Sequence, residues 1–173
     1  MNKFTSKIDY FIDQYTVEKQ LYKLGPKWLK RGWLEKEDFL TICLWKSRRP
    51  KKLYIANAAL EIKNCTRAAF SEKDELLKLN HLTKLSGVSV PTASAILSVT
   101  NPQDYPIIDE RCIQSLNKLG CITWETITPN RWLDYISIVR TIAKAYGKTA
   151  REVEMGLFAY NRIMLDREYK NLY

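Results

Sequence analysis

The sequence predicts an all-α protein, a single two-lobed helical domain spanning residues 1–173. Apolar residues recur every three or four positions along most of the chain, which is the spacing of amphipathic helices. Sustained alternation of apolar and polar residues, the pattern of a strand, is missing. With 46% hydrophobic and 27% charged residues, the chain has the composition of one globular domain. Helices joined by short turns favour two packed lobes with a groove between them.

Five apolar stripes predict helices in chain order. Their members are Ile8, Phe11, Ile12 and Tyr15; Phe39, Ile42, Cys43 and Lys46; Ile55, Ala59 and Ile62; Trp132, Ile136, Val139, Ala143 and Tyr146; and Val153, Leu157, Tyr160 and Met164. We expect the first helical stretch to end at Gly25-Pro26 and the fourth at Gly147, because glycine and proline terminate helices. The second should start in the acidic segment 35–38 and stop near Arg49-Pro50.

The charge balance is strongly basic. The chain has 28 Lys and Arg against 19 Asp and Glu, a net charge of +9. Such a surplus favours polyanionic partners, since each cation placed near a phosphate releases condensed counterions. Charge alone does not separate a DNA-binding protein from a helical scaffold or protein-interaction domain. The interpretation as a scaffold or interaction domain therefore stays open.

The cysteines give no sign of a metal site. Cys43, Cys65, Cys112 and Cys121 form no CxxC pair, and His81 is the one histidine of the chain. These spacings fit neither zinc nor an iron–sulfur cluster, so we expect buried thiols in a reducing compartment. The first residues, 1–13, lack the apolar run of a secretory signal, and no stretch approaches transmembrane length. The expected location is therefore the cytoplasm, at the nucleoid.

The most informative segment is residues 82–97, LTKLSGVSVPTASAIL. Leu82 and Leu85 share one face of a short helix, and Gly87 permits the positive φ of a sharp turn. Pro91 suits the first turn of a following helix, where its missing N–H costs nothing. This pattern predicts a helix-hairpin-helix motif at about residues 80–99, whose exposed N–H groups would bind a DNA phosphate. The alternative is an ordinary hairpin of two helices.

An aspartate follows this hairpin after a polar loop. Asp109 comes directly after Pro106-Ile107-Ile108 and stands where a new helix should begin. An aspartate at such a position is often an N-cap that satisfies free backbone N–H groups. Taken alone, this observation favours the capping role.

Together these two segments resemble the helix-hairpin-helix-GPD superfamily of base-excision DNA glycosylases. The family shares a Leu-Pro-Gly-Val-Gly hairpin, a helix, a loop, and an apolar pair followed by an aspartate. Thr-Ala-Ser-Ala-Ile-Leu at 92–97 and Pro-Ile-Ile-Asp at 106–109 are similar to the mismatch adenine glycosylases. The match covers about residues 82–116, with the catalytic-aspartate segment at 106–116.

The resemblance implies roles for individual residues. Asp109 matches the catalytic aspartate, which stabilises the cationic sugar or activates water as the glycosidic bond breaks. Gly87 matches the glycine that brings backbone amides to a phosphate. In several members, carbonyls at the positions of Thr83, Leu85 and Val88 hold a monovalent cation, K⁺ or Na⁺, and no other cofactor is implied.

The chain departs from the family at several positions. Pro91 stands where bifunctional members carry a nucleophilic lysine, so a monofunctional enzyme is expected unless another lysine substitutes. Ser86 and Ser89 replace the hairpin proline and second glycine, and Arg111 replaces a His or Asn. A catalytically silent helix-hairpin-helix DNA-binding protein is therefore the alternative to a DNA glycosylase.

Further residues are predicted to contact DNA. A basic run at residues 46–52, next to Trp45, exceeds what a helix C-terminus needs, although a solvated helix end would also explain it. One tryptophan could stack on an extruded base, although helix packing is the simpler role for each. The base-pocket candidates are Trp28, Trp33 and Trp45. The predicted contacts to double-stranded DNA are Lys84, Gly87, Val88, Ser89, Thr92, Arg48, Arg49 and Lys51.

Overall fold

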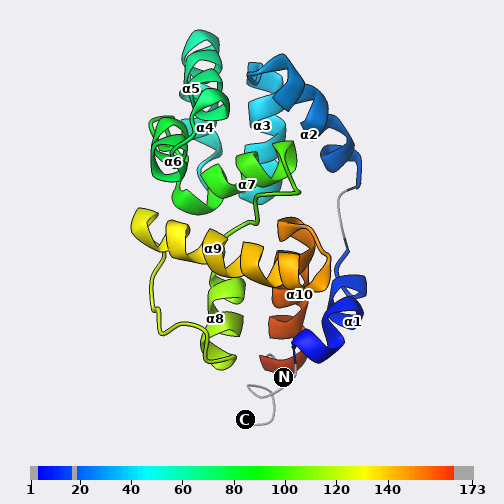
Figure 1. Ribbon diagram of the computed structural model, residues 1–173. Helices are drawn as coiled ribbons and strands as arrows, with labels where there is room; N and C mark the ends of the chain where they lie inside the picture. Colours follow the sequence, from blue (N-terminus) through cyan, green and yellow to red (C-terminus); the bar gives the residue numbers. More distant parts are fainter. Residues whose placement is uncertain (1–3, 17–18, 166–173) are drawn as a thin grey trace.

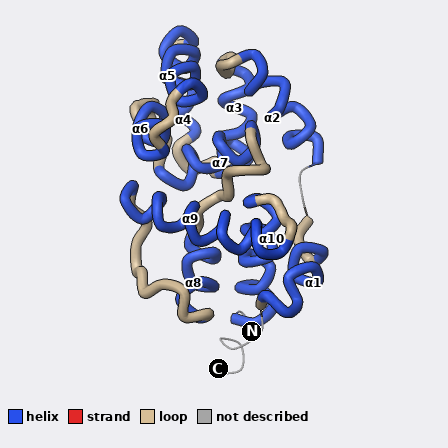
Figure 2. Tube along the Cα trace, in the orientation of Figure 1, coloured by secondary structure: helices blue, strands red, loops and turns tan. Residues whose placement is uncertain are grey.

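The computed structural model describes residues 4–16 and 19–165, and all regular structure within these ranges is helical, as predicted (Figures 1 and 2). No described residue lies in a strand. The elements are η1 (Thr5–Lys7), α1 (Ile8–Asp13), α2 (Lys19–Arg31), α3 (Lys36–Lys46), α4 (Lys51–Ala56), α5 (Ala59–Ser71), α6 (Glu75–Thr83), α7 (Val90–Thr100), α8 (Glu110–Lys118), α9 (Pro129–Tyr146), α10 (Ala150–Tyr160) and η2 (Asn161–Leu165).

Two helices organise the packing of the others. Helix α7 contacts α2, α3 and α6, and this group occupies the upper part of Figure 1. Helix α10 contacts α1, α8 and α9 in the lower part. Contacts between α6 and α9 connect the two groups. The loop from α7 to α8, which carries Asp109, passes from one group to the other.

Helix α7 is buried on every side because its sequence is small and apolar. All residues from Thr92 to Thr100 are buried, including Ala93 and Ala95, which are fully inaccessible. A helix that is apolar all round belongs in a core. Its position explains why the segment 82–97 has no polar stripe after the turn.

The expected helix end at Gly25-Pro26 is wrong, because α2 continues through both residues to Arg31. Gly25 lies against the backbone of α7, and a Cβ there would sit 1.7 Å from the carbonyl oxygen of Val99. The glycine is needed for this close approach of two helices. Tertiary packing overrides the local tendency of both residues to end a helix.

The third predicted stripe is divided between two helices. Ile55 lies on α4 and Ile62 on α5, with Asn57 between them in an extended conformation. The side chain of Asn57 donates to the carbonyls of Leu53 and Tyr54, at 3.0 and 3.1 Å, and so ends α4. The predicted end of α9 is confirmed, since Gly147 is its left-handed C-cap with φ +63°.

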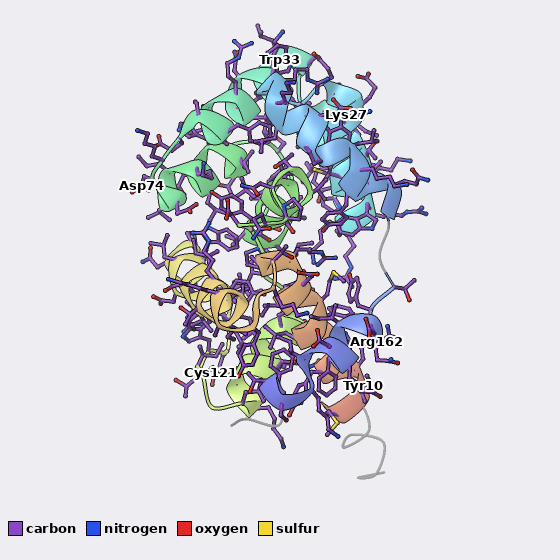
Figure 3. The ribbon with its side chains drawn as sticks, turned by 45° about the vertical axis from the view of Figure 1, so that its right-hand side comes forward. Tyr10, Lys27, Trp33, Asp74, Cys121 and Arg162 are labelled. Atoms are coloured by element: carbon purple, nitrogen blue, oxygen red, sulfur yellow. The ribbon has the colours of Figure 1, made fainter. Side chains whose placement is uncertain are left out.

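The cysteines differ in exposure. Cys43 and Cys112 are buried as expected, Cys65 is half-buried, and Cys121 is exposed at the lower end of the molecule (Figure 3). The expectation of four buried thiols is therefore wrong for Cys121, which follows the exposed Gly120 in a turn after α8. Within the described ranges, every helix is too short or too polar to cross a bilayer.

Candidate functional site

The turn between α6 and α7, residues 84–89, requires its glycine. Gly87 has φ +82°, a conformation that side chains disfavour. A Cβ at this position would lie 2.9 Å from the Cβ of Leu53 and 3.1 Å from the ring of Tyr54. The turn is thus seated on α4, where no larger residue fits.

Asn57 fixes this turn from the other side. Its side-chain oxygen accepts the Ser86 N–H at 2.7 Å, and its amide donates to the Ser86 carbonyl at 3.0 Å. Asn57 is only 2% exposed, so its end of both bonds is shielded from water, although Ser86 is exposed. A buried, fully bonded amide holds the backbone of the turn in one conformation.

The start of α7 has uncapped backbone N–H groups. Ser89 is the N-cap with φ −88°, a conformation open to any residue, which is why serine is accommodated here. Its hydroxyl makes no capping bond to the helix, and Pro91 occupies the first turn as predicted. The remaining N–H groups of this turn carry the partial positive charge of a helix N-terminus.

Two predicted DNA contacts near this turn are largely buried. Thr92 is 3% exposed, and its hydroxyl lies 3.2 Å from the Tyr54 hydroxyl and 3.3 Å from that of Ser89. Its side chain therefore supports the turn from inside and does not face a phosphate. Val88 is also buried, and its N–H donates to the Leu85 carbonyl at 3.0 Å. A cation bound by the carbonyls of Thr83, Leu85 and Val88 would have to use the second lone pair on Leu85.

The segment before Asp109 is anchored on both sides. The Ile108 N–H donates to the Ser94 hydroxyl on α7 at 3.1 Å. The Tyr135 hydroxyl on α9 donates to the Ile107 carbonyl at 2.8 Å. These two buried hydrogen bonds hold the backbone of Ile107 and Ile108 in place. They therefore fix the position of the next residue, Asp109.

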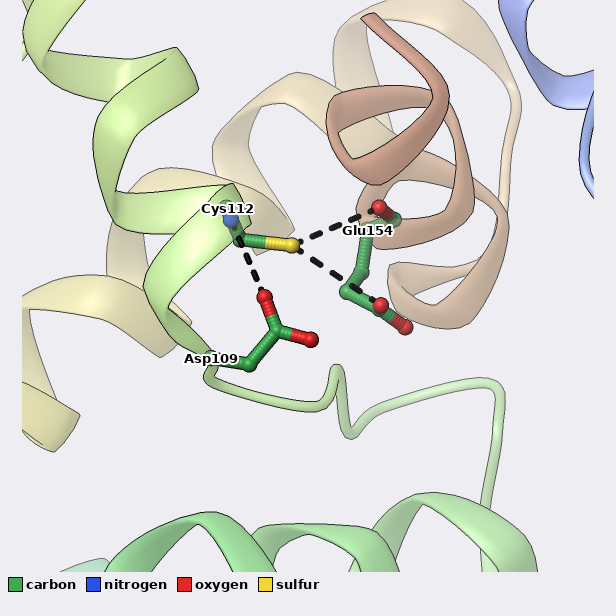
Figure 4. Close-up of side chains that lie close together, drawn as sticks. All are labelled: Asp109, Cys112 and Glu154. Atoms are coloured by element: carbon green, nitrogen blue, oxygen red, sulfur yellow. Dashed lines mark hydrogen bonds between the residues drawn. The ribbon is translucent and has the colours of Figure 1, made fainter. Parts of the chain in front are cut away.

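Asp109 is the N-cap of α8, as the simpler interpretation predicted. Its Oδ1 accepts the Cys112 N–H at 3.0 Å (Figure 4). Its Oδ2 faces the ammonium of Lys46, the last residue of α3, at 3.4 Å. The side chains of Asp109 and Lys46 each keep 18% of their exposure, so solvent reaches the pair.

A buried polar cluster lies behind Asp109. The thiol of Cys112 is 3.7 Å from the backbone carbonyl oxygen of Glu154 and 3.8 Å from its Oε1 (Figure 4). Glu154 in turn forms a buried ion pair with Arg151. Desolvation, and then the nearby charge of Asp109, hold the pKa of the Cys112 thiol well above its ordinary value.

This cluster does not suit a metal ion. Ligand atoms of Asp109, Cys112 and Glu154 lie within 4.8 Å of one another. However, Lys46 and Arg151 already neutralise the two carboxylates. A thiol must lose its proton to bind a metal, and the raised pKa of Cys112 opposes that loss.

The basic residues predicted to contact DNA lie on the segments that form or support the α6–α7 turn. Arg48, Arg49 and Lys51 are exposed and fill the connection from α3 into α4, the helix on which Gly87 rests. Lys84 is exposed at the C-cap of α6, where the turn begins. This connection follows Lys46, which pairs with Asp109, and leads into α4, which supports the turn. The same stretch of chain therefore contacts both Asp109 and the turn.

The three tryptophans are dispersed. Trp28 is 7% exposed and belongs to the core. Trp33 lies at the upper end of the molecule, where its ring contacts Lys63 at 4.5 Å and Arg67 at 4.9 Å (Figure 3). Trp45 directly precedes Lys46, packs edge-on against Tyr22 at 6.1 Å, and lines a groove of 390 Å³ between α2 and α3. Trp45 precedes Asp109's partner in the sequence, but its ring lies between α2 and α3.

Sequence reasoning missed two residues that organise the site. Lys46 was visible as a member of the basic run, but its pairing with Asp109 joins residues 63 positions apart. Asn57 gave no signal, because its role depends on α4 and the turn meeting in space.

Comparison with models of known protein families, with curated proteins and with solved structures gave no match to this chain.

Proposed function

We propose that this protein is a DNA N-glycosylase that flips a damaged or mismatched base from duplex DNA and hydrolyses its glycosidic bond. The observation that carries the proposal is the position of Asp109. Its carboxylate is anchored through one oxygen to α8, reachable by solvent, and paired through the other with Lys46. A carboxylate in this position would stabilise the sugar, which develops oxocarbenium character as the base departs.

The α6–α7 turn would act as a helix-hairpin-helix that holds the DNA backbone. The uncapped N–H groups at the start of α7 favour an anion, and a phosphate needs no base contact there. Lys84, Arg48, Arg49 and Lys51 are exposed cations on the elements that form or support this turn. In this proposal a K⁺ or Na⁺ at the turn carbonyls would bridge protein and phosphate.

The base would be drawn out between the upper and lower helix groups, which form the two lobes of the proposed enzyme. Extruding a base is cheapest where it is damaged or mispaired, which gives a first level of selectivity. Trp45 is the base-pocket candidate nearest in sequence to Lys46, and its ring lines the groove between α2 and α3, so a base stacked on it would have to reach that groove. An enzyme of this kind would act on chromosomal DNA in the cytoplasm.

The activity is tested with a panel of duplexes, each carrying one lesion or mismatch: uracil, a thymine mispair, 8-oxoguanine or an alkylated purine. Excision leaves an abasic site that alkali converts into a strand break. We expect one or a few of these duplexes to be cut after alkali treatment, and intact strands on every duplex would contradict the proposal.

A catalytically silent DNA-binding protein is the second candidate. The N-cap bond and the Lys46 ion pair give Asp109 a complete structural role without chemistry. This candidate predicts DNA binding at low salt with no cut on any duplex. Failure to bind DNA at low salt would instead favour a helical scaffold with a basic surface.

A further inference from the structure

We propose that the groove between α2 and α3 is a docking site for an acidic amphipathic helix of a partner protein. The groove has a volume of 390 Å³ and opens between two helices that each pack against α7. Its apolar lining comes from both helices: Leu21 and Leu24 of α2, and Leu44 and Trp45 of α3. None of these side chains takes part in the proposed cleavage of the glycosidic bond, so the inference goes beyond that function.

The apolar lining is open to solvent. Leu24 keeps 42% of its surface exposed, and Leu44 and Trp45 on the other wall are half-buried. Thr41 joins Leu44 and Trp45 on one face of α3, at positions i, i+3 and i+4, so this wall of the groove follows the helix axis. The apolar face of a second helix fills a groove of this kind, with anchor side chains at i, i+3, i+4 and i+7.

The α2 side of the groove is bordered by a row of cations. Lys23, Lys27 and Lys30 are exposed and recur every three or four residues, so they lie along one side of α2, on which Lys27 is labelled in Figure 3. Lys23 directly precedes Leu24, and Lys27 follows it by one helical turn, which places the row beside the groove. Among the described residues, no carboxylate forms an ion pair with these lysines.

A second cation stands on the other wall. Arg48 is exposed and lines the groove just beyond the end of α3. Like charges at the spacing of the α2 lysines repel one another, so acidic side chains beside the anchors of a docked helix would relieve that repulsion. An apolar strip between cations is therefore complementary to a helix whose apolar face is flanked by Asp and Glu.

An acidic helix fits this groove better than nucleic acid or a second copy of the chain. A phosphate backbone has no apolar face to cover the leucines, and exposed bases bind mainly by stacking on aromatic rings. Trp45 is the single aromatic side chain among the described residues that line the groove, and it packs edge-on against Tyr22. Two copies of a chain with net charge +9 repel each other. With this occupant, Trp45 contacts a protein partner and not an extruded base.

The probe is a fluorescein-labelled peptide of about 20 residues, long enough to form a helix, with leucines at i, i+3, i+4 and i+7 and glutamates flanking that face. Fluorescence anisotropy gives its Kd for the intact protein. We expect Leu24→Ser to raise the Kd at least about tenfold, because it removes apolar surface from the groove wall. The double variant Lys23→Gln/Lys27→Gln should raise the Kd at least about threefold and weaken its salt dependence.

Each variant has a matched control. Leu60→Ser replaces a leucine that is 69% exposed on α5, and Lys73→Gln/Lys144→Gln removes two exposed lysines outside α2 and α3. Both controls should bind the peptide within a factor of about two of wild type. Equal affinities for Leu24→Ser and Leu60→Ser, or no binding by wild type at about 1 mM peptide, would overturn the inference.

A single-stranded oligonucleotide, labelled in the same way, tests the nucleic-acid alternative. We expect Leu24→Ser and Leu60→Ser to bind the oligonucleotide with equal affinity. If Leu24→Ser weakens oligonucleotide binding and leaves peptide binding unchanged, the groove is a nucleic-acid site and the inference is overturned.

Discussion

The two carboxylate oxygens of Asp109 have different contacts, one structural and one available for the proposed chemistry. Oδ1 accepts a backbone N–H of α8, and Oδ2 faces Lys46 and solvent. The first contact is the ordinary role of an N-cap aspartate. The contact with Lys46 is not part of N-capping, and it directs Oδ2 of the carboxylate away from α8. Capping and catalysis are therefore compatible at this position.

Gly87 is the residue whose replacement should disturb the α6–α7 turn most directly. In Gly87→Ala, the positive φ alone should cost about 1–3 kcal/mol, and the contact with Leu53 adds to it. Gly120→Ala is the matched control, since Gly120 also has a positive φ but has nothing within 4 Å of a Cβ. Urea unfolding should show a larger loss for Gly87→Ala, and equal losses would contradict the close packing of the turn on α4.

At the scale of elements, helix ends were predictable where a local signal matched the local structure. Gly147 ends α9, Pro91 lies in the first turn of α7, and Asp109 caps α8. The signal failed at Gly25-Pro26, because α2 must keep its small residue against α7. The apolar periodicity also did not show where α4 ends, because Asn57 ends that helix through side-chain hydrogen bonds.

The element that should bind DNA is the α6–α7 turn, and Lys84 tests it. Lys84→Ala removes an exposed cation at the C-cap of α6. We expect weaker DNA binding at all sequences, with the slope of log affinity against log salt reduced by about 1. The measurement is fluorescence anisotropy over a salt series.

Lys73→Ala provides the control for this series. Lys73 is an exposed lysine just before the opposite end of α6, so the variant has the same charge change away from the turn. Its salt slope should stay near that of wild type. Equal slopes for Lys84→Ala and wild type would argue against a phosphate contact at the turn.

At the scale of the whole molecule, the candidate site exists only because separate parts of the chain meet. The sequence predicts Asp109, the turn and the basic run as three local features. It does not predict that Lys46 meets Asp109, because that contact depends on how α3 and α8 are placed by α7 and α10. Long-range pairing of this kind follows from packing of the core and has no local pattern.

The packing of the whole molecule also predicts the reactivity of its thiols. Burial raises the pKa of all four thiols, so their accessibility decides the order of reaction: Cys43 and Cys112 are inaccessible, Cys65 is half-buried and Cys121 is exposed. Because the reagent must reach the thiolate, iodoacetamide at pH 8 should modify Cys121 first and Cys65 more slowly. Cys43 and Cys112 should react only after unfolding. Rapid modification of either in the native protein, measured by peptide mass spectrometry, would contradict the described core.

The variant Asp109→Asn separates a chemical role of Asp109 from its role as a helix cap. Asparagine caps a helix as well as aspartate, so the fold and the DNA affinity should persist. Single-turnover excision, measured on whichever lesion the wild type removes, should fall by at least about 100-fold while the Kd for the same duplex stays within a factor of about three. Excision by Asp109→Asn at the wild-type rate would show that Asp109 is a helix cap and has no part in the chemistry.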